Sequence, residues 1–91
     1  METTTTNATA RLATPTHPAL RALHDAAALD GRLVNAWRLS DGREVVAVRG
    51  AIHVTRDAAE QGGEVLRAPW PEDVGARLAV CLLLSGAEVS S

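Results

Sequence analysis

The stretch LVNAWRLSDGREVVAVRG, residues 33–50, specifies the fold class because its side chains follow a period of two. From Leu33 to Leu39, apolar and more polar positions alternate, as they do in a half-buried strand. The Asp41-Gly42 dipeptide then gives the strongest short-range hairpin signal, since such a turn needs positive φ at both central residues. The valine-rich run from Arg43 to Arg49 follows as the second strand. The stretch predicts an antiparallel hairpin.

Downstream of this hairpin the sheet is expected to continue. Gly50 either forms a tight turn with Arg49 into a strand over residues 51–56, or marks a bulge in one long strand. A polar loop ending in Gly62-Gly63 follows, and Glu64–Arg67 is a short candidate edge strand. Because short connections favour neighbouring strands, the sequence predicts a three- or four-stranded antiparallel meander.

A helix is expected before the sheet, over residues 17–30. Thr16 is placed to act near its N-cap, and Pro18 fits the first turn, where its missing N–H costs nothing. Leucine and alanine recur at helical spacing inside it. Gly31 provides the left-handed residue that ends it.

A second helix is expected to close the chain, beginning after Pro71 and ending at Ser85-Gly86. Glu72 and Asp73 lie in its first turn, where carboxylates interact favourably with the helix dipole. The remainder is apolar on nearly every side, and such a helix needs burial on every side. A small sheet covers one side only. The first helix, a second copy of the chain or another protein must cover the rest.

The composition fits one small domain with a modest core: 91 residues carry a net charge of −2. Residues 1–16 are threonine-rich and are expected to form a disordered tail. Residues 17–91 are expected to form a single small α+β domain, with an N-terminal helix, the meander and a C-terminal apolar helix. The basic residues are all arginine, a bias typical of a GC-rich, actinobacterial genome.

Several classes of partner are disfavoured by the same composition. Scattered arginines in a slightly acidic chain do not form the basic stripe on which nucleic-acid binding depends. The longest nearly apolar run, Leu78–Leu84, falls far short of the roughly 20 residues of a bilayer span. The N-terminal sequence lacks the charged and apolar regions of a secretory signal. We therefore expect a cytoplasmic protein without a membrane partner.

Candidate catalytic, cofactor-binding and metal-ligating residues do not emerge from the spacing of reactive side chains. His17 and His24 lie about two helical turns apart, too far for a two-ligand chelate, and His53 lies mid-strand with Thr55 on a polar face. His17, near a helix start, is expected to be solvated. Cys81 lies in the most apolar helix and fits a core role. We expect no cofactor, no metal and no enzymatic activity.

The expected interface consists of Trp70, Val80, Leu83 and Leu84. Trp70, between two prolines, either staples the final helix to the sheet or is exposed as an anchor for a partner. Arginines along the strands favour an acidic partner or, with Glu44 and Glu64 interspersed, an ordinary mixed-charge surface. The primary hypothesis is a non-enzymatic protein-interaction or regulatory domain, a homodimer through its C-terminal helix. An accessory subunit of a larger enzyme or complex is the alternative, and a DNA-binding regulator is less favoured.

One family resemblance rests on the order of short motifs over residues 37–84. Trp37-Arg38-Leu39-Ser40, a valine-rich strand, Val54-Thr55-Arg56-Asp57, and Gly63 with Val65 and Leu66 together resemble the small actinobacterial BldB-like developmental-regulator domain. The chain departs from that pattern in the inserted Thr55 and in a Trp70 that precedes the final helix. The resemblance implies a small, self-associated, non-enzymatic regulator acting through protein contacts, and it implies no catalytic residues.

Overall fold

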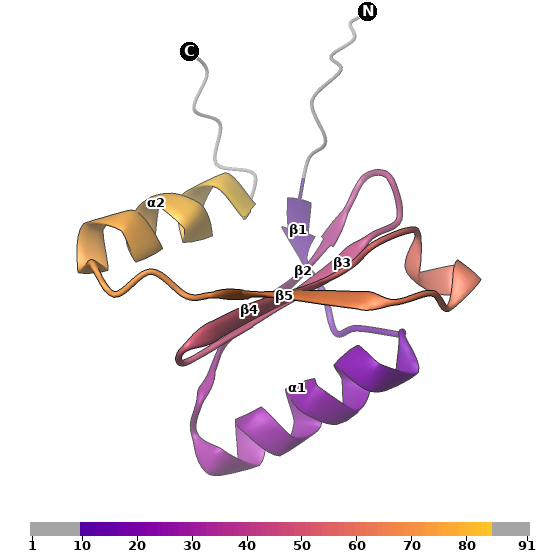
Figure 1. Cartoon of the computed structure of the whole chain (residues 1–91), viewed down its shortest axis with the longest axis horizontal. Coiled ribbons are helices and arrows are strands. Elements are labelled where there is room, and N and C mark those ends of the chain that lie inside the picture. The colour runs from indigo at the N-terminus through magenta and orange to yellow at the C-terminus, as the bar shows by residue number, and fades with distance from the viewer. Residues whose placement is uncertain (1–9, 85–91) are drawn as a thin grey trace, which may run out of the picture.

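The computed structural model describes residues 10–84 and shows one five-stranded antiparallel sheet with a helix on each face (Figure 1). The strands lie in the sheet in their order along the chain. The α+β class and the meander are therefore confirmed. The elements are β1 (Ala10–Leu12), α1 (Pro18–Asp30), β2 (Leu33–Leu39), β3 (Glu44–Val48), β4 (Ala51–Thr55), the 3-10 turn η1 (Ala59–Gln61), β5 (Val65–Pro69) and α2 (Val74–Leu84).

The prediction of three or four strands is wrong because β1 lies inside the segment expected to be a disordered tail. Ala10 pairs with Leu39, and Leu12 pairs with Trp37, so β1 extends the sheet beyond β2. Three residues are too few for a period of two to be recognised in the sequence. The expectation of a disordered tail over residues 1–16 is therefore wrong for Ala10–Leu12, which form β1. Residues 1–9 of the expected tail lie outside the described residues.

Both expected turns are present. Gly42 has φ 94° between β2 and β3, and Gly50 has φ 87° between β3 and β4. The positive φ of Gly50 and the antiparallel pairing of Val48 with Ala51 show that the chain turns at Gly50 and does not continue through a bulge in one long strand. A strand irregularity occurs instead in β2, where the register shifts between Leu33 and Asn35.

Gly42→Ala is expected to lower the free energy of unfolding by about 2–3 kcal/mol, because it combines a positive φ with a steric clash. A Cβ atom on Gly42 would lie 2.9 Å from the Cβ of Ala58. Gly50→Ala is the matched control: its φ is also positive, but no described atom lies within 4 Å of the added Cβ. We expect a cost of about 1 kcal/mol there. Equal losses in urea unfolding followed by circular dichroism would contradict the clash.

Helix α1 begins at Pro18 and ends before Gly31, as expected, but its N-cap residue differs from the expected one. Pro18 occupies the first turn, and the N–H of Gly31 (φ 72°) caps the last carbonyls. The N-cap is His17 in place of Thr16: His17 Nδ1 accepts a hydrogen bond from the backbone N–H of Ala19 at 3.2 Å. His17 is buried, at 6 % exposed, so the expectation of a solvated side chain is wrong.

The core consists of two clusters separated by the sheet, and β3 contributes to both. Helix α1 covers one face, and α2 covers part of the other (Figure 1). The α1 side contains Leu20, Ala27, Ala36, Val46, Val48 and Ala51. The α2 side contains Ala10, Trp37, Val45, Ala47 and Trp70, with Val80, Cys81 and Leu84 packed against it.

Because the two helices lie on opposite faces of the sheet, α1 does not cover the outer side of α2 (Figure 1). The first helix is therefore excluded as the element that covers the rest of the apolar helix, and a second copy of the chain or another protein remains. The helix begins at Val74, so the expectation that Glu72 and Asp73 lie in its first turn is wrong. Both precede the helix, and Asp73 Oδ2 accepts a hydrogen bond from the backbone N–H of Ala76 at 2.8 Å, as an N-cap side chain does. Its predicted end at Ser85-Gly86 lies outside the described residues.

Candidate protein interface

Helix α2 has one charged side chain, Arg77, in the sequence VGARLAVCLLL. Val80, Cys81 and Leu84 pack against the sheet cluster. Cys81 is half-buried there, in agreement with the expected core role. Arg77 folds back along the helix start, where its Nη2 donates to the backbone oxygen of Glu72 at 3.2 Å. The charge therefore lies at the first turn, and the described residues after it are apolar.

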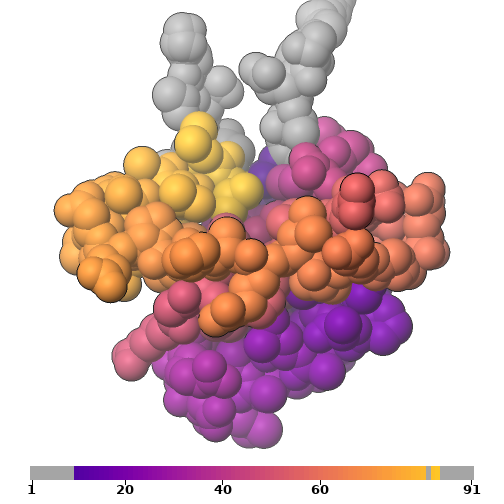
Figure 2. All heavy atoms as spheres, viewed as in Figure 1, coloured from indigo at the N-terminus to yellow at the C-terminus, as the bar shows by residue number. Residues whose placement is uncertain are grey.

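The outward side of α2 is exposed to an unusual degree for large apolar residues. Val74 is 69 % exposed, Leu78 is 59 % and Leu83 is 60 %. At 3.6 residues per turn, Leu78 and Leu83 fall on the half of the helix opposite its sheet-facing residues, and Val74 lies at the margin of that half. In Figure 2 the α2 atoms, orange to yellow, form a separate shoulder on the side of the molecule away from α1. A helix with this pattern is half-covered by its own domain.

A groove of about 420 Å³ runs beside α2 over the uncovered part of the same sheet face. Leu66 in edge strand β5 is 43 % exposed within it. The described lining residues are Leu39, Val45, Ile52, Val54, Leu66, Arg67, Ala68, Val80 and Leu84. The groove and the outer side of α2 are two apolar surfaces on the same side of the sheet.

Arg67 lies at the rim of this groove and does not place its charge on the floor. Strand residues alternate between the two faces of a sheet, and Leu66 and Ala68 lie on the α2 face with their partners Val54 and Ile52. Arg67 therefore stands on the α1 face, with its partner His53. The described floor of the groove is hydrocarbon.

The four residues predicted for the interface separate into three environments. Trp70 is 4 % exposed and lies in the α2-side core. It therefore packs the final helix onto the sheet, and the alternative of an exposed anchor for a partner is wrong. Val80 and Leu84 face the sheet and line the groove. Leu83 alone among the four lies on the outer surface. Sequence reasoning missed Val74 and Leu78, because periodicity defines faces without telling which one meets the sheet.

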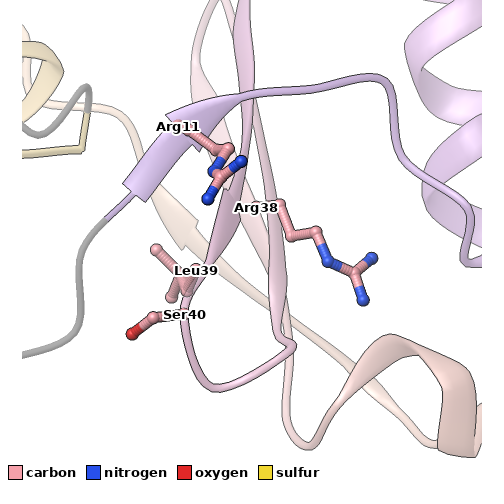
Figure 3. A pocket seen from close by; sticks show the side chains of 4 residues that line it. All are labelled: Arg11, Arg38, Leu39 and Ser40. Carbon is pink, nitrogen blue, oxygen red and sulfur yellow. The ribbon is translucent and has the colours of Figure 1, made fainter.

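A second cleft, of about 300 Å³, is lined by Arg11, Arg38, Leu39 and Ser40 (Figure 3). Arg11 and Arg38 are cross-strand neighbours on β1 and β2. Figure 3 shows their guanidinium groups pointing in different directions. Arg38 Nη1 donates to Glu44 Oε2 at 2.9 Å, so a carboxylate already offsets one of the two charges. The two guanidinium groups therefore do not point toward one common position in the cleft.

Two other arginines of the sheet are also paired. Arg43 Nε lies 2.8 Å from Asp41 Oδ2, and Arg56 Nη1 lies 3.2 Å from Glu64 Oε1. These contacts correspond to the mixed-charge surface described above, in which cations lie beside carboxylates.

Glu44 is the centre of a buried polar cluster that the sequence does not reveal. It is 1 % exposed, and Oε1 accepts from the backbone N–H of Thr16 at 2.8 Å and of His17 at 2.9 Å. Oε2 accepts from Thr16 Oγ1 at 2.8 Å and from Arg38. Burial raises the pKa of Glu44, but these donors outweigh it and leave the pKa below its usual value. The cluster ties the start of α1 to β3.

The three histidines lie in separate environments. His17 Nε2 is 2.9 Å from the carbonyl of Gly63, which assigns it as the donor. His24 Nδ1 contacts Asp25 at 3.0 Å on the surface. Burial, and then the charge of Arg67, lower the pKa of His53. Within residues 10–84, no three histidine, cysteine or carboxylate side chains gather as a metal site would require.

Comparisons with protein-family models, with curated proteins and with solved structures give no match. In the part of the chain that the structure describes, neither helix has the length and apolar content that a bilayer crossing demands. Function must therefore be inferred from the surface of the chain itself.

Proposed function

We propose that this chain is a small non-enzymatic interaction domain that self-associates through α2 and the sheet face beside it. The observation that carries the proposal is the outer side of α2, where Val74, Leu78 and Leu83 are each more than half exposed. Burying an apolar side chain of this size stabilises an assembly by about 1.5–3 kcal/mol. Among homo-oligomers, two-fold symmetric dimers are by far the commonest, and a second copy is therefore the partner that we propose.

The resemblance to BldB-like regulators implies the same behaviour, a self-associated domain acting through protein contacts. The alternative, an accessory subunit of a larger complex, would use the same face of α2, and no separate observation favours it. For a DNA-binding regulator, the support is weaker, because Arg38, Arg43 and Arg56 are each paired with a carboxylate.

Leu83→Asp is expected to raise the dimer dissociation constant at least about tenfold, because it places a carboxylate in an apolar contact. Light scattering after size exclusion, over a range of concentrations, measures the change. A native chain that stays monomeric throughout, or a Leu83→Asp variant that dimerises like the native chain, would contradict the proposal.

Leu29→Asp is the matched control. Leu29 is 90 % exposed near the end of α1, on the opposite face of the sheet. The substitution makes the same chemical change in the last turns of a helix, so any loss of helix stability is similar. We expect the Leu29→Asp variant to keep the native dissociation constant.

A further inference from the structure

We propose that, in the dimer, each copy places the outer side of its α2 in the groove of the other copy, over strands β4 and β5. This inference rests on the proposed self-association and specifies its geometry. The occupant of the groove is a second copy of this chain. The contact is isologous, because each copy provides one helix and one groove. The two α2 helices then lie side by side between the two sheets.

The groove and the outer side of α2 are two apolar surfaces that one chain cannot bring together. The chain's own α2 already forms a wall of the groove with Val80 and Leu84. Leu78 and Leu83 project from the far side of that helix. The α2 of a second molecule can place these residues over Leu66, and a two-fold arrangement covers both surfaces at once.

The dimensions of the two surfaces agree. Helix α2 has 11 residues and is therefore about 16 Å long. Strands β4 and β5 have five residues each, or about 17 Å. A second α2 laid along these strands matches the exposed part of the sheet from end to end.

The chemistry of the groove also fits this occupant. Its described floor, formed on β4 and β5 by Ile52, Val54, Leu66 and Ala68, offers only hydrocarbon. A charged or polar segment seated there would lose its hydration without gaining a partner. The outer side of α2 carries the apolar side chains of Leu78 and Leu83. At 3.6 residues per turn, Arg77 falls on the same half of the helix as Val80 and Leu84, which faces the helix's own sheet. A second α2 therefore presents its apolar side to the groove.

The β5 edge of the sheet, which borders the groove, is a poor alternative route for a second copy. The backbone N–H of Arg56 donates to the carbonyl of Glu64 at 2.9 Å, and that of Trp70 to the carbonyl of Gly50 at 3.2 Å. The even-numbered residues of this segment thus bond toward β4, and the backbone of residues 65, 67 and 69 faces the open edge. Pro69 has no N–H, and proline on an edge strand hinders strand addition. Beside the groove, the face of the sheet is therefore a better contact surface than the β5 edge.

The first test places a charge in the groove. Leu66→Asp and, independently, Ala68→Glu are expected to raise the dimer dissociation constant at least about tenfold, with Leu29→Asp as the control. Both positions are exposed, and circular dichroism checks that each variant keeps the native spectrum. If both variants dimerise normally while Leu83→Asp does not, the groove is not the binding site of the second α2, although self-association through α2 stands. If the native chain is monomeric, self-association itself fails.

The second test identifies the occupant by cross-linking between two differently tagged chains, both carrying Cys81→Ser. One chain also carries Leu83→Cys and the other Leu66→Cys, and a short bifunctional maleimide is added to the mixture. We expect a cross-linked product that contains both tags, because the proposed contact places residue 83 of one copy over residue 66 of the other.

Leu29→Cys in place of Leu83→Cys is the matched control, since Leu29 is also an exposed leucine near the end of a helix, on the other face of the sheet. We expect it to give no product with the Leu66→Cys chain. A mixture that is dimeric by light scattering but yields no more product from Leu83→Cys than from this control would overturn the assignment of the groove to a second α2.

Discussion

Trp70→Ala is expected to lower the free energy of unfolding by about 3–5 kcal/mol, the range for removing a large aromatic side chain from a packed core. Trp70 is 4 % exposed and packs with Trp37, Val45 and Ala47 on the α2 side of the sheet. Val80, Cys81 and Leu84 of α2 pack against the cluster that contains Trp70, so the variant also loses part of the surface on which that helix rests. For a domain of this size, such a loss is a large fraction of the total stability.

The measurement is urea unfolding followed by circular dichroism, with the fluorescence of the remaining Trp37 as a second probe. Trp70→Phe is the control, because it keeps an apolar ring in the same pocket, and we expect it to cost about half as much as the alanine variant. A Trp70→Ala variant within about 1 kcal/mol of the native chain would mean that this side chain is not part of the core.

Glu44→Gln is expected to lower the free energy of unfolding by about 3–5 kcal/mol, because it removes the buried partner of an ion pair. The two carboxylate oxygens accept four hydrogen bonds, from Thr16, His17 and Arg38. The glutamine amide replaces one acceptor oxygen with an NH₂ donor, which then faces other donors. Arg38 loses its counter-charge in the same step. Urea unfolding at neutral pH measures the loss.

The same carboxylate makes stability depend on acid. Because the pKa of Glu44 is lower in the folded chain than its ordinary value of 4.5, its contribution is fully present above that value. It is lost as the pH falls through the lower, folded-state pKa. We expect the native chain to lose stability progressively below about pH 4.5, and the Glu44→Gln variant to lose less over the same interval.

Asp41→Asn provides the comparison for this pH series. Burial raises the pKa of Asp41, and contacts with Arg43 outweigh it and lower the pKa overall. Asp41 is exposed, so we expect its removal to change the free energy of unfolding by no more than about 1 kcal/mol. If the Glu44→Gln variant kept the full acid sensitivity of the native chain, another carboxylate would have to be its source.

Local features of the fold follow from short stretches of the sequence alone. Asp41-Gly42 specified the first hairpin, and Pro18 and Gly31 specified the limits of the first helix, because each depends on the backbone preferences of one or two residues. The period of two between Leu33 and Leu39 specified the second strand. The apolar surplus of α2, and hence the need for a cover, was also visible from composition.

Contacts between distant segments account for the rest, and these appear only in the folded chain. Ala10–Leu12 is a strand only because β2 offers it an unpaired edge, and no three-residue pattern encodes that edge. Glu44 is buried because Thr16 and His17, 28 and 27 positions earlier, supply its donors.

The apolar residues of α2 show the same division. Periodicity grouped them into faces but could not orient the helix against the sheet. Of the residues predicted for the interface, Leu83 is exposed and Trp70 lies in the core, and Val74 and Leu78, which were not predicted for it, are exposed as well. Packing against the remainder of the chain determines which side of an apolar element is left exposed, and that packing depends on residues far away in the sequence.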